Sequence, residues 1–371
     1  MNPERVAVVG AGAVGLTTAF ELATRGVRVT LFERDEPGAG MSGRAAGICY
    51  DAYAEDIDVA VADRAMERFR ELDGEGDFRF HETPYVFLAR EGDDPAISAL
   101  EEAVEQMQRH DRNVALVDAE ALDSYSIQTD DVGVAGVCSN AGWADPKAYI
   151  DLLVAKCERA SVEFRFGTEV SIRADPPGVA IDDVVTERYD VVVVAAGVFS
   201  SRLLENAGYP VALKPYRVQA LVADCEYSGP IVYDATDESY LRPHPRGVLA
   251  GDGVELAEAD LNEWDSTADE WFVSDSLDAV THRTGTAPKL ARAWAGLCGA
   301  TPDRNPLVGE VTSNIYLAAG WHGHGFMWAP AIGEMLAQQV CGENVLPVSF
   351  DPARFEGTES FDVLDGMVLD E

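Results

Sequence analysis

The pattern Gly10-Ala-Gly12-Ala-Val-Gly15 constrains the fold of this chain more than any other feature. An apolar run at 6–9 precedes it, and a helix-like segment at 16–25 follows it. In that strand–turn–helix context, glycines allow a tight turn and a close approach of the backbone to a pyrophosphate. Glu33 ends the next apolar run, about 20 residues further on, where an acidic side chain binds a ribose hydroxyl. The chain therefore is expected to begin with a dinucleotide-binding β-α-β unit.

A second glycine-rich stretch, Gly320-Trp-His-Gly-His-Gly-Phe326, lies near the other end of the chain. A nicotinamide site does not need such a second stretch. FAD does, because its reactive ring lies far from its pyrophosphate. The two stretches together predict FAD as the cofactor.

The two cofactor-binding halves lie at the two ends of the chain, so the substrate domain must be inserted between them. We expect the α/β class, with a Rossmann-like FAD-binding domain interleaved with a mainly antiparallel β-sheet substrate domain that carries helices. Residues 1–76, 144–214 and 288–371 form the FAD-binding domain, and residues 77–143 and 215–287 form the substrate domain. Asp145 and Pro146 predict a helix start, and a later helix is predicted over 330–341.

The chain is strongly acidic, with 65 Asp and Glu against 28 Lys and Arg and a formal net charge of -37. Such a charge repels nucleic acid and anionic lipid, which argues against both as partners. The acidic residues are spread along the chain rather than gathered in a tail. We expect adaptation to a salt-rich cytoplasm, where screening weakens self-repulsion, and therefore a halophilic archaeal source.

The six cysteines show no spacing typical of metal ligands, so no metal site is expected. They are typical of reduced thiols inside a cell. The N-terminus lacks the apolar core of a signal peptide, and no apolar run is long enough to span a bilayer. We therefore expect a cytoplasmic protein without a membrane span.

Five further segments complete a recognisable pattern, at 42–47, 193–200, 294–297, 301–309 and 319–327. Together with the N-terminal glycines, they resemble the FAD-dependent amine and amino-acid oxidoreductases. This superfamily includes D-amino acid oxidase, glycine oxidase and sarcosine oxidase. The resemblance spans nearly the whole chain and is strongest at its two ends.

The resemblance implies a set of residues that contact FAD. Within it, Glu33 meets the adenosine ribose, Val170 meets the adenine, and the last five residues face the flavin ring. The full set is Gly10, Ala11, Gly12, Ala13, Val14, Gly15, Glu33, Arg34, Ser42, Arg44, Ala45, Ala46, Gly47, Val170, Ala196, Gly197, Gly296, Gly323, His324, Gly325, Phe326 and Met327.

Three residues are candidates for catalysis: Tyr240, Arg242 and His324. Tyr240 resembles a substrate-contacting tyrosine of the family, and residues i and i+2 share one face of a strand. Arg242 is therefore expected to face the pocket and clamp a carboxylate; the alternative is a surface Tyr–Arg pair. His324 is either a base or a side chain that packs against the cofactor without titrating.

The chain departs from the family at Cys298, where amino-acid oxidases carry the arginine that holds the substrate carboxylate. Either the substrate is not an α-amino acid, or the anchor moves to Arg242 or Arg292. The cysteine that sarcosine oxidases bond to flavin corresponds to Gly296, so FAD is expected to bind noncovalently. No lysine stands at 248–251, where sarcosine oxidases use one for reaction with oxygen, which favours a dehydrogenase.

These observations predict an enzyme that oxidises the C–N bond of an amino acid or secondary amine to an imine, by hydride transfer to flavin N5. Its expected partners are a small-molecule amine or amino acid and an electron acceptor, either O2 or a carrier, with a homo-oligomer possible. Two alternatives are a flavoprotein subunit of a multi-subunit dehydrogenase and a related flavoenzyme acting on a hydroxy acid. A third alternative is a nicotinamide-dependent dehydrogenase without flavin.

Overall fold

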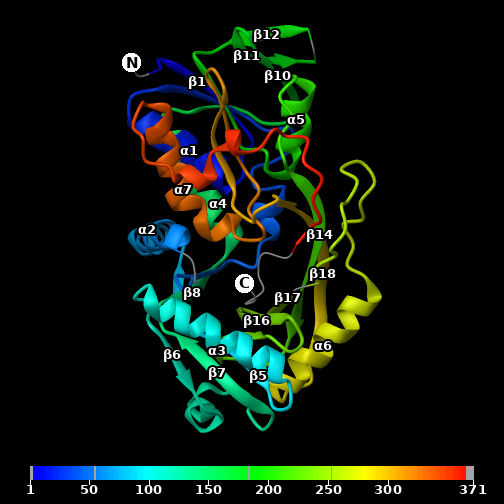
Figure 1. Cartoon of the computed structure of the whole chain (residues 1–371). Coiled ribbons are helices and arrows are strands. Elements are labelled where there is room, and N and C mark those ends of the chain that lie inside the picture. The colour runs from blue at the N-terminus through cyan, green and yellow to red at the C-terminus, as the bar shows by residue number, and fades with distance from the viewer. Residues whose placement is uncertain (1–2, 54–55, 183, 252, 365–371) are drawn as a thin grey trace.

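The chain folds into two regions, each built on its own large β-sheet (Figure 1). The computed structural model describes residues 3–53, 56–182, 184–251 and 253–364. The upper region in Figure 1 contains segments from the start, the middle and the end of the chain. This arrangement confirms the predicted α/β class with interleaved regions.

The upper region is built on a six-stranded sheet. Neighbouring strands pair in parallel, except for β19 and β20 at one edge, which are antiparallel. In sheet order the strands are β19 (Leu307–Thr312), β20 (Ile315–Ala319), β13 (Val191–Val194), β1 (Arg5–Val9), β2 (Arg28–Phe32) and β9 (Glu163–Arg165).

Helices cover one face of this sheet and a small sheet covers the other. Val6 and Val8 pack among the helices, whereas Ala7 and Val9 pack toward the small sheet. This alternation is expected when side chains along a strand point to opposite faces. The helices are α1 (Ala13–Thr24), α4 (Pro146–Arg159) and α7 (Gly325–Val340), and the small sheet contains β10 (Val170–Ala174), β11 (Pro177–Ile181) and β12 (Val185–Arg188).

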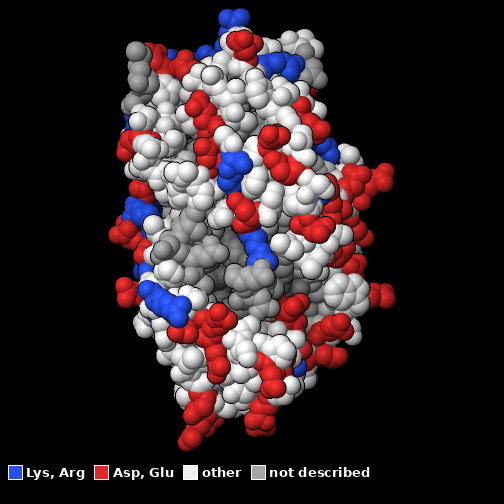
Figure 2. Space-filling view, viewed as in Figure 1, with Lys and Arg blue, Asp and Glu red and all other residues white. Residues whose placement is uncertain are grey.

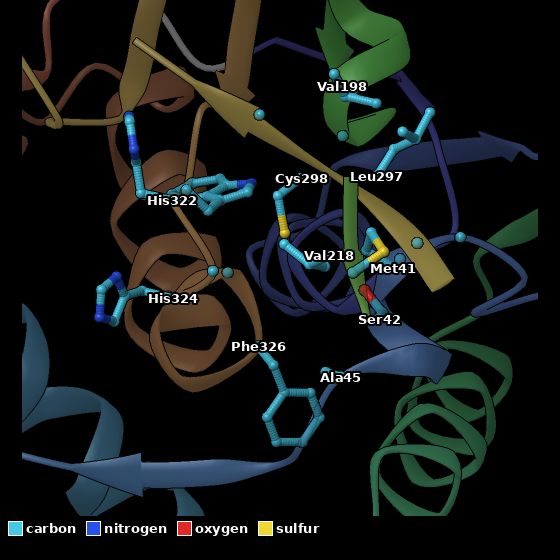
Figure 3. Close-up of a pocket in the computed structure, with 18 of the residues that line it drawn as sticks. Met41, Ser42, Ala45, Val198, Val218, Leu297, Cys298, His322, His324 and Phe326 are labelled. Carbon is cyan, nitrogen blue, oxygen red and sulfur yellow. The ribbon is translucent and has the colours of Figure 1, made fainter. Parts of the chain in front are cut away.

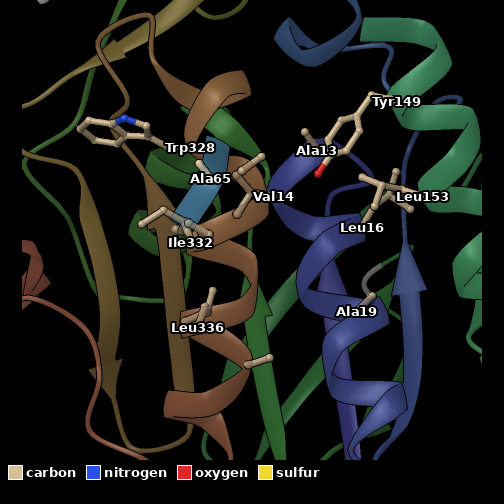
Figure 4. Packing of buried hydrophobic residues seen from close by; sticks show 14 of the residues in the cluster. Ala13, Val14, Leu16, Ala19, Ala65, Tyr149, Leu153, Trp328, Ile332 and Leu336 are labelled. Atoms are coloured by element: carbon tan, nitrogen blue, oxygen red, sulfur yellow. The ribbon is translucent and has the colours of Figure 1, made fainter. Parts of the chain in front are cut away.

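The helices α1 and α7 pack closely although they are about 300 residues apart in the chain (Figure 4). Gly333 makes this approach possible, since a Cβ there would lie 2.5 Å from Cβ of Thr17. Leu16, Ile332 and Leu336 belong to the same buried cluster. The packing brings the N-termini of the two helices, each preceded by a glycine-rich stretch, into one region.

The lower region is built on an eight-stranded sheet. Only the pair β15–β5 is parallel, and all other neighbours are antiparallel. In sheet order the strands are β18 (Lys289–Ala300), β14 (Lys214–Asp224), β17 (Gly247–Gly251), β16 (Ser239–His244), β15 (Ile231–Asp234), β5 (Tyr85–Arg90), β7 (Val132–Cys138) and β6 (Val114–Val117).

Two helices cover opposite faces of this sheet. Tyr85 and Phe87 share a buried cluster with residues of α3 (Asp94–Arg109), whereas Val86 and Leu88 share one with residues of α6 (Glu270–Thr284). The face toward α3 also carries Tyr233 and Tyr240.

The remaining elements are β3 (Ile48–Tyr50), β8 (Ala141–Ala144) and β4 (Phe80–Glu82), which form one sheet, α2 (Asp56–Leu72), α5 (Ser200–Asn206) and the 3₁₀ helices η1 (Met41–Arg44), η2 (Ala119–Tyr125), η3 (Gly197–Phe199), η4 (Val348–Phe350) and η5 (Pro352–Arg354).

The predicted start of α4 is confirmed, because the Asp145 side chain accepts a hydrogen bond from the amide of Ala148 at 2.9 Å. The predicted start of α7 was five residues late. The sequence predicts Pro330 as its first residue, whereas the helix begins at Gly325 and Pro330 lies inside it.

The predicted domain boundary at 288 also differs from the structure. Strand β18 was assigned to the FAD-binding segment, yet it pairs with β14 along its length and forms the edge of the eight-stranded sheet. Gly296 and Gly299 obscured this strand in the sequence, since glycine is unfavourable in a strand interior. A Cβ at 296 would lie 2.1 Å from Sδ of Met41, so glycine is required for the close approach of η1.

Most of the charged side chains on the visible face of the molecule are acidic, with few basic ones among them (Figure 2). Among the described residues, no helix is both long enough and apolar enough to cross a bilayer.

Candidate active site

A cavity of about 1520 Å³ is lined by residues from both sheets. This volume exceeds the roughly 300–1,000 Å³ of a typical small-molecule site, so it suits a long cofactor together with a substrate. Figure 3 shows one part of it, where His322 and His324 precede α7 and Cys298 and Val218 come from β18 and β14.

The N-terminal glycine loop forms one wall of the cavity. Gly10 has a φ of +110°, and a Cβ there would lie 2.4 Å from the carbonyl oxygen of Ala195. A Cβ on Gly15 would lie 2.0 Å from the carbonyl oxygen of Gly10. Both positions therefore require glycine, one for the turn and one for packing of the helix against it. Of the predicted loop residues, Ala11 and Gly15 do not line the cavity, whereas Gly10, Gly12, Ala13 and Val14 do.

Glu33 lies at the same end of the cavity, just beyond β2. Its carboxylate accepts hydrogen bonds from the amides of Ala11 at 2.8 Å and Asp35 at 3.0 Å. It thereby links the glycine loop to the chain that follows β2. Beside it, the Arg34 guanidinium lies over the Phe199 ring at 4.2 Å. Val170, Ala196 and Gly197, which were also predicted to meet the cofactor, line this end as well.

The segment around η1 closes the cavity over the N-terminus of α1. Ser42 Oγ accepts a hydrogen bond from the amide of Ala13 at 2.9 Å. The Arg44 guanidinium donates to the carbonyl oxygens of Ala39 and Gly40, and the carbonyl of Arg44 accepts from Nε1 of Trp294 at 3.1 Å. The predicted residues Ser42, Arg44, Ala45, Ala46 and Gly47 all line the cavity.

The second glycine-rich stretch borders the cavity at the N-terminus of α7. Gly323, His324, Gly325, Phe326 and Met327 all line it, as does Gly296 on β18. The positive end of the helix dipole therefore lies at this wall, where it stabilises negative charge.

His324 is buried at this wall and stacks on Trp328 with the rings 5.4 Å apart. Its Nε2 lies 3.3 Å from the hydroxyl of Tyr50. Burial lowers the pKa of His324 to about 4, so the ring is neutral at neutral pH. Of the two predicted roles, packing without titration near pH 7 agrees with this environment.

His322 is also buried and neutral. Its Nε2 accepts a hydrogen bond from the amide of Thr301 at 2.8 Å, and burial lowers its pKa to about 4. That contact joins the C-terminal loop to the end of β18.

Tyr240 lines the cavity as predicted, but Arg242 does not. Arg242 is buried, and its guanidinium donates to the carbonyl oxygens of Ala46 and Pro243 and lies over the Trp143 ring at 4.5 Å. Burial lowers its pKa to about 10. The expectation that it faces the pocket was wrong, because sharing a strand face fixes only the direction in which a side chain starts. The other candidate anchor, Arg292, is exposed, lies over the Trp294 ring at 4.7 Å and is not part of the lining either.

Sequence reasoning missed most of the aromatic side chains of the cavity. They come from β3 and the residues after it, from β5, β14 and β15, and from the loop before α6: Tyr50, Tyr53, Tyr85, Phe87, Tyr216, Tyr233 and Trp264. The continuous buried run at 85–89 is typical of a strand covered on both faces, and such a run alone does not say which face meets the cofactor.

Comparisons with known proteins agree with this geometry. Residues 5–339 match the family model described as DAO, FAD dependent oxidoreductase. The chain is 28% identical to a glycine oxidase from Pseudomonas aeruginosa, over 94% of this chain and 99% of that protein. It is 25% identical to a gamma-glutamylputrescine oxidoreductase from Escherichia coli, over 91% of this chain and 84% of that protein.

Solved structures give the same result. The L-proline dehydrogenase from P. horikoshii superposes with a TM-score of 0.86 at 28% identity and covers 96% of this chain and 98% of its own. A glycine oxidase from Geobacillus kaustophilus, with a TM-score of 0.83 at 22% identity, covers 95% and 99% and shares the fold.

Proposed function

We propose that this chain, which belongs to the DAO family of FAD-dependent oxidoreductases, oxidises a C–N bond of an amine or amino acid to an imine. The predicted superfamily and the predicted cofactor FAD are confirmed by the family model and the glycine oxidase relatives. One observation carries the proposed reaction: a single cavity joins the glycine-built end near Glu33 to an aromatic pocket near His324.

The residues of the cavity fit FAD. The glycine loop and Glu33 offer amides and a carboxylate to the pyrophosphate and ribose. Gly197, with a φ of +58°, has no atom within 4 Å of a Cβ position, so this part of the wall leaves room for a ligand. When bound, FAD supplies at N5 the acceptor for a hydride from the carbon next to the substrate nitrogen.

The chain's own residues bind, orient and desolvate the amine. Burial disfavours the protonated form of the reacting amino group, and its neutral form has the lone pair that forms the C=N bond. His324, neutral near pH 7, lies within hydrogen-bonding reach of Tyr50 and orders that side of the pocket. Positioning of this kind supplies a large part of the rate enhancement.

Two features support noncovalent FAD and a carrier as electron acceptor. The position that corresponds to the flavin-bonding cysteine is Gly296, and Sδ of Met41 fills the space where its side chain would begin. The described lining of the cavity includes no lysine. Because sarcosine oxidases use a lysine for reaction with oxygen, a lining without lysine favours a dehydrogenase over an oxidase.

An anaerobic panel tests the reaction. Purified protein in concentrated salt is mixed with D- and L-amino acids, N-methylglycine, proline, alkylamines and 2-hydroxy acids, and the visible flavin absorbance is recorded. We expect bleaching by at least one amine, with a carbonyl product formed when the imine hydrolyses. Bleaching by a hydroxy acid alone would contradict C–N oxidation. Oxidised flavin with every compound would favour a subunit without its own substrate.

A further inference from the structure

One row of residues crosses the face of the eight-stranded sheet that turns toward α3. Its members are direct cross-strand neighbours, so their side chains leave the sheet on the same side. With neighbouring strands about 4.8 Å apart, the row extends roughly 24 Å. From β5 through β15, β16, β17 and β14 to β18 the row contains Phe87, Tyr233, Tyr240, Gly251, Ala220 and Trp294.

Four of these six residues are aromatic, and all four line the cavity. We call Phe87, Tyr233, Tyr240 and Trp294 the aromatic row. The gap at Gly251 is filled by the Tyr240 ring, because a Cβ on Gly251 would lie 2.3 Å from the Tyr240 hydroxyl oxygen. The row is therefore a nearly continuous surface of ring faces and edges.

Further rings surround the row. Tyr85 lies 4.3 Å from Phe87 between ring centroids, and Tyr50 lies 5.1 Å from Tyr85. Tyr50 in turn stacks on Tyr53 at 5.2 Å. The ring contacts thus continue from the aromatic row through Tyr85 to Tyr50 and Tyr53.

Four arginines belong to the described lining, and each of them either lies away from the aromatic row or already contacts other groups of the protein. They are Arg34, Arg44, Arg202 and Arg304. Arg34 lies at the Glu33 end of the cavity, over the Phe199 ring, and Arg202 lies on α5 nearby. Arg44 donates hydrogen bonds to carbonyl oxygens of the loop before η1.

Arg304 lies beyond the far end of β18. It follows Thr301, whose amide bonds to His322, and Thr301 is seven residues from Trp294 along the chain. At about 3.3 Å per residue, Thr301 is roughly 23 Å from Trp294, and the Arg304 charge lies near His322, whose pKa is lowered mainly by burial and also by this charge. Residues 1–2, 54–55, 183, 252 and 365–371 add no lysine or arginine to the chain.

An acidic and an amide side chain of α3 also line the cavity, the exposed Glu102 and the half-buried Gln106. Ala99, Glu102, Ala103, Gln106 and Met107 line the cavity, a spacing that places them on one stripe of the helix. Ala103 and Met107 share the buried cluster of Phe87, Tyr233 and Tyr240. The charged group on this stripe is the carboxylate of Glu102.

We propose that the substrate is an amine that carries a second, cationic amino group and no carboxylate beside the oxidised bond. The inference rests on the proposed C–N oxidation. The aromatic row binds the ammonium end by cation–π contact, and Glu102 adds charge complementarity. A carboxylate among these rings would meet Glu102 as a like charge, and the guanidinium of Arg292, which lies over the Trp294 ring at the β18 end of the row, is outside the cavity lining.

A matched set of ligands tests the substrate class by binding alone. Three trimethylammonium compounds of equal chain length end in an ammonium, a methyl or a carboxylate group. Their quaternary nitrogen has no lone pair for a C=N bond, so calorimetry with the holoenzyme measures affinity without turnover. We expect the ammonium-ended compound to bind most tightly. Tightest binding of the carboxylate-ended compound overturns the proposal.

Two pairs of variants locate the contacts. Tyr233→Leu should weaken binding of the ammonium-ended compound about 2- to 30-fold, while Tyr233→Phe, which keeps the ring face, should not. Glu102→Gln should weaken it about two- to fivefold, while Glu101→Gln, exposed on the same helix outside the lining, should not. FAD content verifies that each variant is folded. Equal losses for Tyr233→Phe and Tyr233→Leu would contradict ring-face recognition.

The reaction and the substrate class are separable. The same three compounds are then prepared with a secondary methylamine in place of the trimethylammonium group. Each is mixed with the holoenzyme under anaerobic conditions. If the ammonium-ended amine binds but leaves the flavin oxidised, the proposed oxidation fails and the binding class stands. If the carboxylate-ended amine reduces the flavin fastest, and Arg292→Ala abolishes this, the substrate class fails and the oxidation stands.

Discussion

The two ends of the cavity are built in different ways. At the Glu33 end, the shape is set by backbone: Gly10 and Gly15 cannot carry a Cβ, and Glu33 holds two amides. At the aromatic end, the shape is set by side chains from strands far apart in the sequence, such as Phe87 and Tyr233. A backbone-built site tolerates little change, whereas a side-chain-built site can be altered without loss of the fold. This difference matches a fixed cofactor and a substrate that varies among relatives.

The largest effect is expected from Gly10→Ala. The new Cβ would lie 2.4 Å from a backbone oxygen at a φ of +110°, so the loop must move and FAD should be lost. The matched control is Gly26→Ala, which also has a positive φ but no atom within 4 Å. We expect Gly10→Ala to lower the free energy of unfolding by about 1–3 kcal/mol more than the control. Flavin-to-protein ratio and denaturant unfolding measure both effects. Full FAD content in Gly10→Ala would refute a backbone-built cofactor end.

Glu33→Gln should weaken FAD binding about 10- to 100-fold. A neutral amide replaces the charged acceptor that joins the amides of Ala11 and Asp35, and hydrogen bonds to charged groups contribute about 1.5–3 kcal/mol. Titration of the apoprotein with FAD gives the affinity. Glu36→Gln, also in the lining, serves as the control and should bind FAD normally. Equal losses of FAD affinity in the two variants would indicate an effect of the negative charge rather than of the hydrogen bonds of Glu33.

The two buried histidines before α7 predict a pH dependence of stability. His322 and His324 have a pKa of about 4, mainly because burial disfavours their charged forms. Between about pH 6.5 and 4 the unfolded chain therefore binds more protons than the folded one, so stability falls as pH falls. Each histidine adds up to about 1.4 kcal/mol per pH unit. His324→Gln should show a shallower slope in that window in denaturant unfolding, with no change of slope between pH 7 and 8. An unaltered slope below pH 6.5 would count against burial of a neutral ring.

The smallest effect is expected from Gly251→Ala, which displaces the Tyr240 ring. We expect a several-fold loss of substrate affinity with unchanged FAD content, since the change lies in the side-chain-built end. Gly229→Ala is a matched control, because its Cβ would lie 2.6 Å from the Tyr227 hydroxyl, in a residue outside the cavity lining. Loss of FAD from Gly251→Ala would show that the two ends are not independent.

The same contrast explains what the sequence could predict. The glycine loops, Glu33 and Asp145 were found because local backbone geometry restricts which residues can stand there. The meeting of Phe87 with Tyr233 depends on the pairing of β5 with β15, which no local pattern encodes. Arg242 starts on the same strand face as Tyr240, yet backbone carbonyls engage its guanidinium.

The order of strands in the six-stranded sheet has a consequence for synthesis. Strand β1 pairs with β13, and β13 pairs with β20, so the sheet unites residues 5–9 with residues 191–194 and 315–319. At about 5–20 residues per second, roughly 10 to 40 s separate the emergence of β1 and β13 from the ribosome. The loop at His322–Met327 follows later still. The nascent chain must therefore keep its first βαβ unit soluble, and it can enclose FAD only when translation is nearly complete.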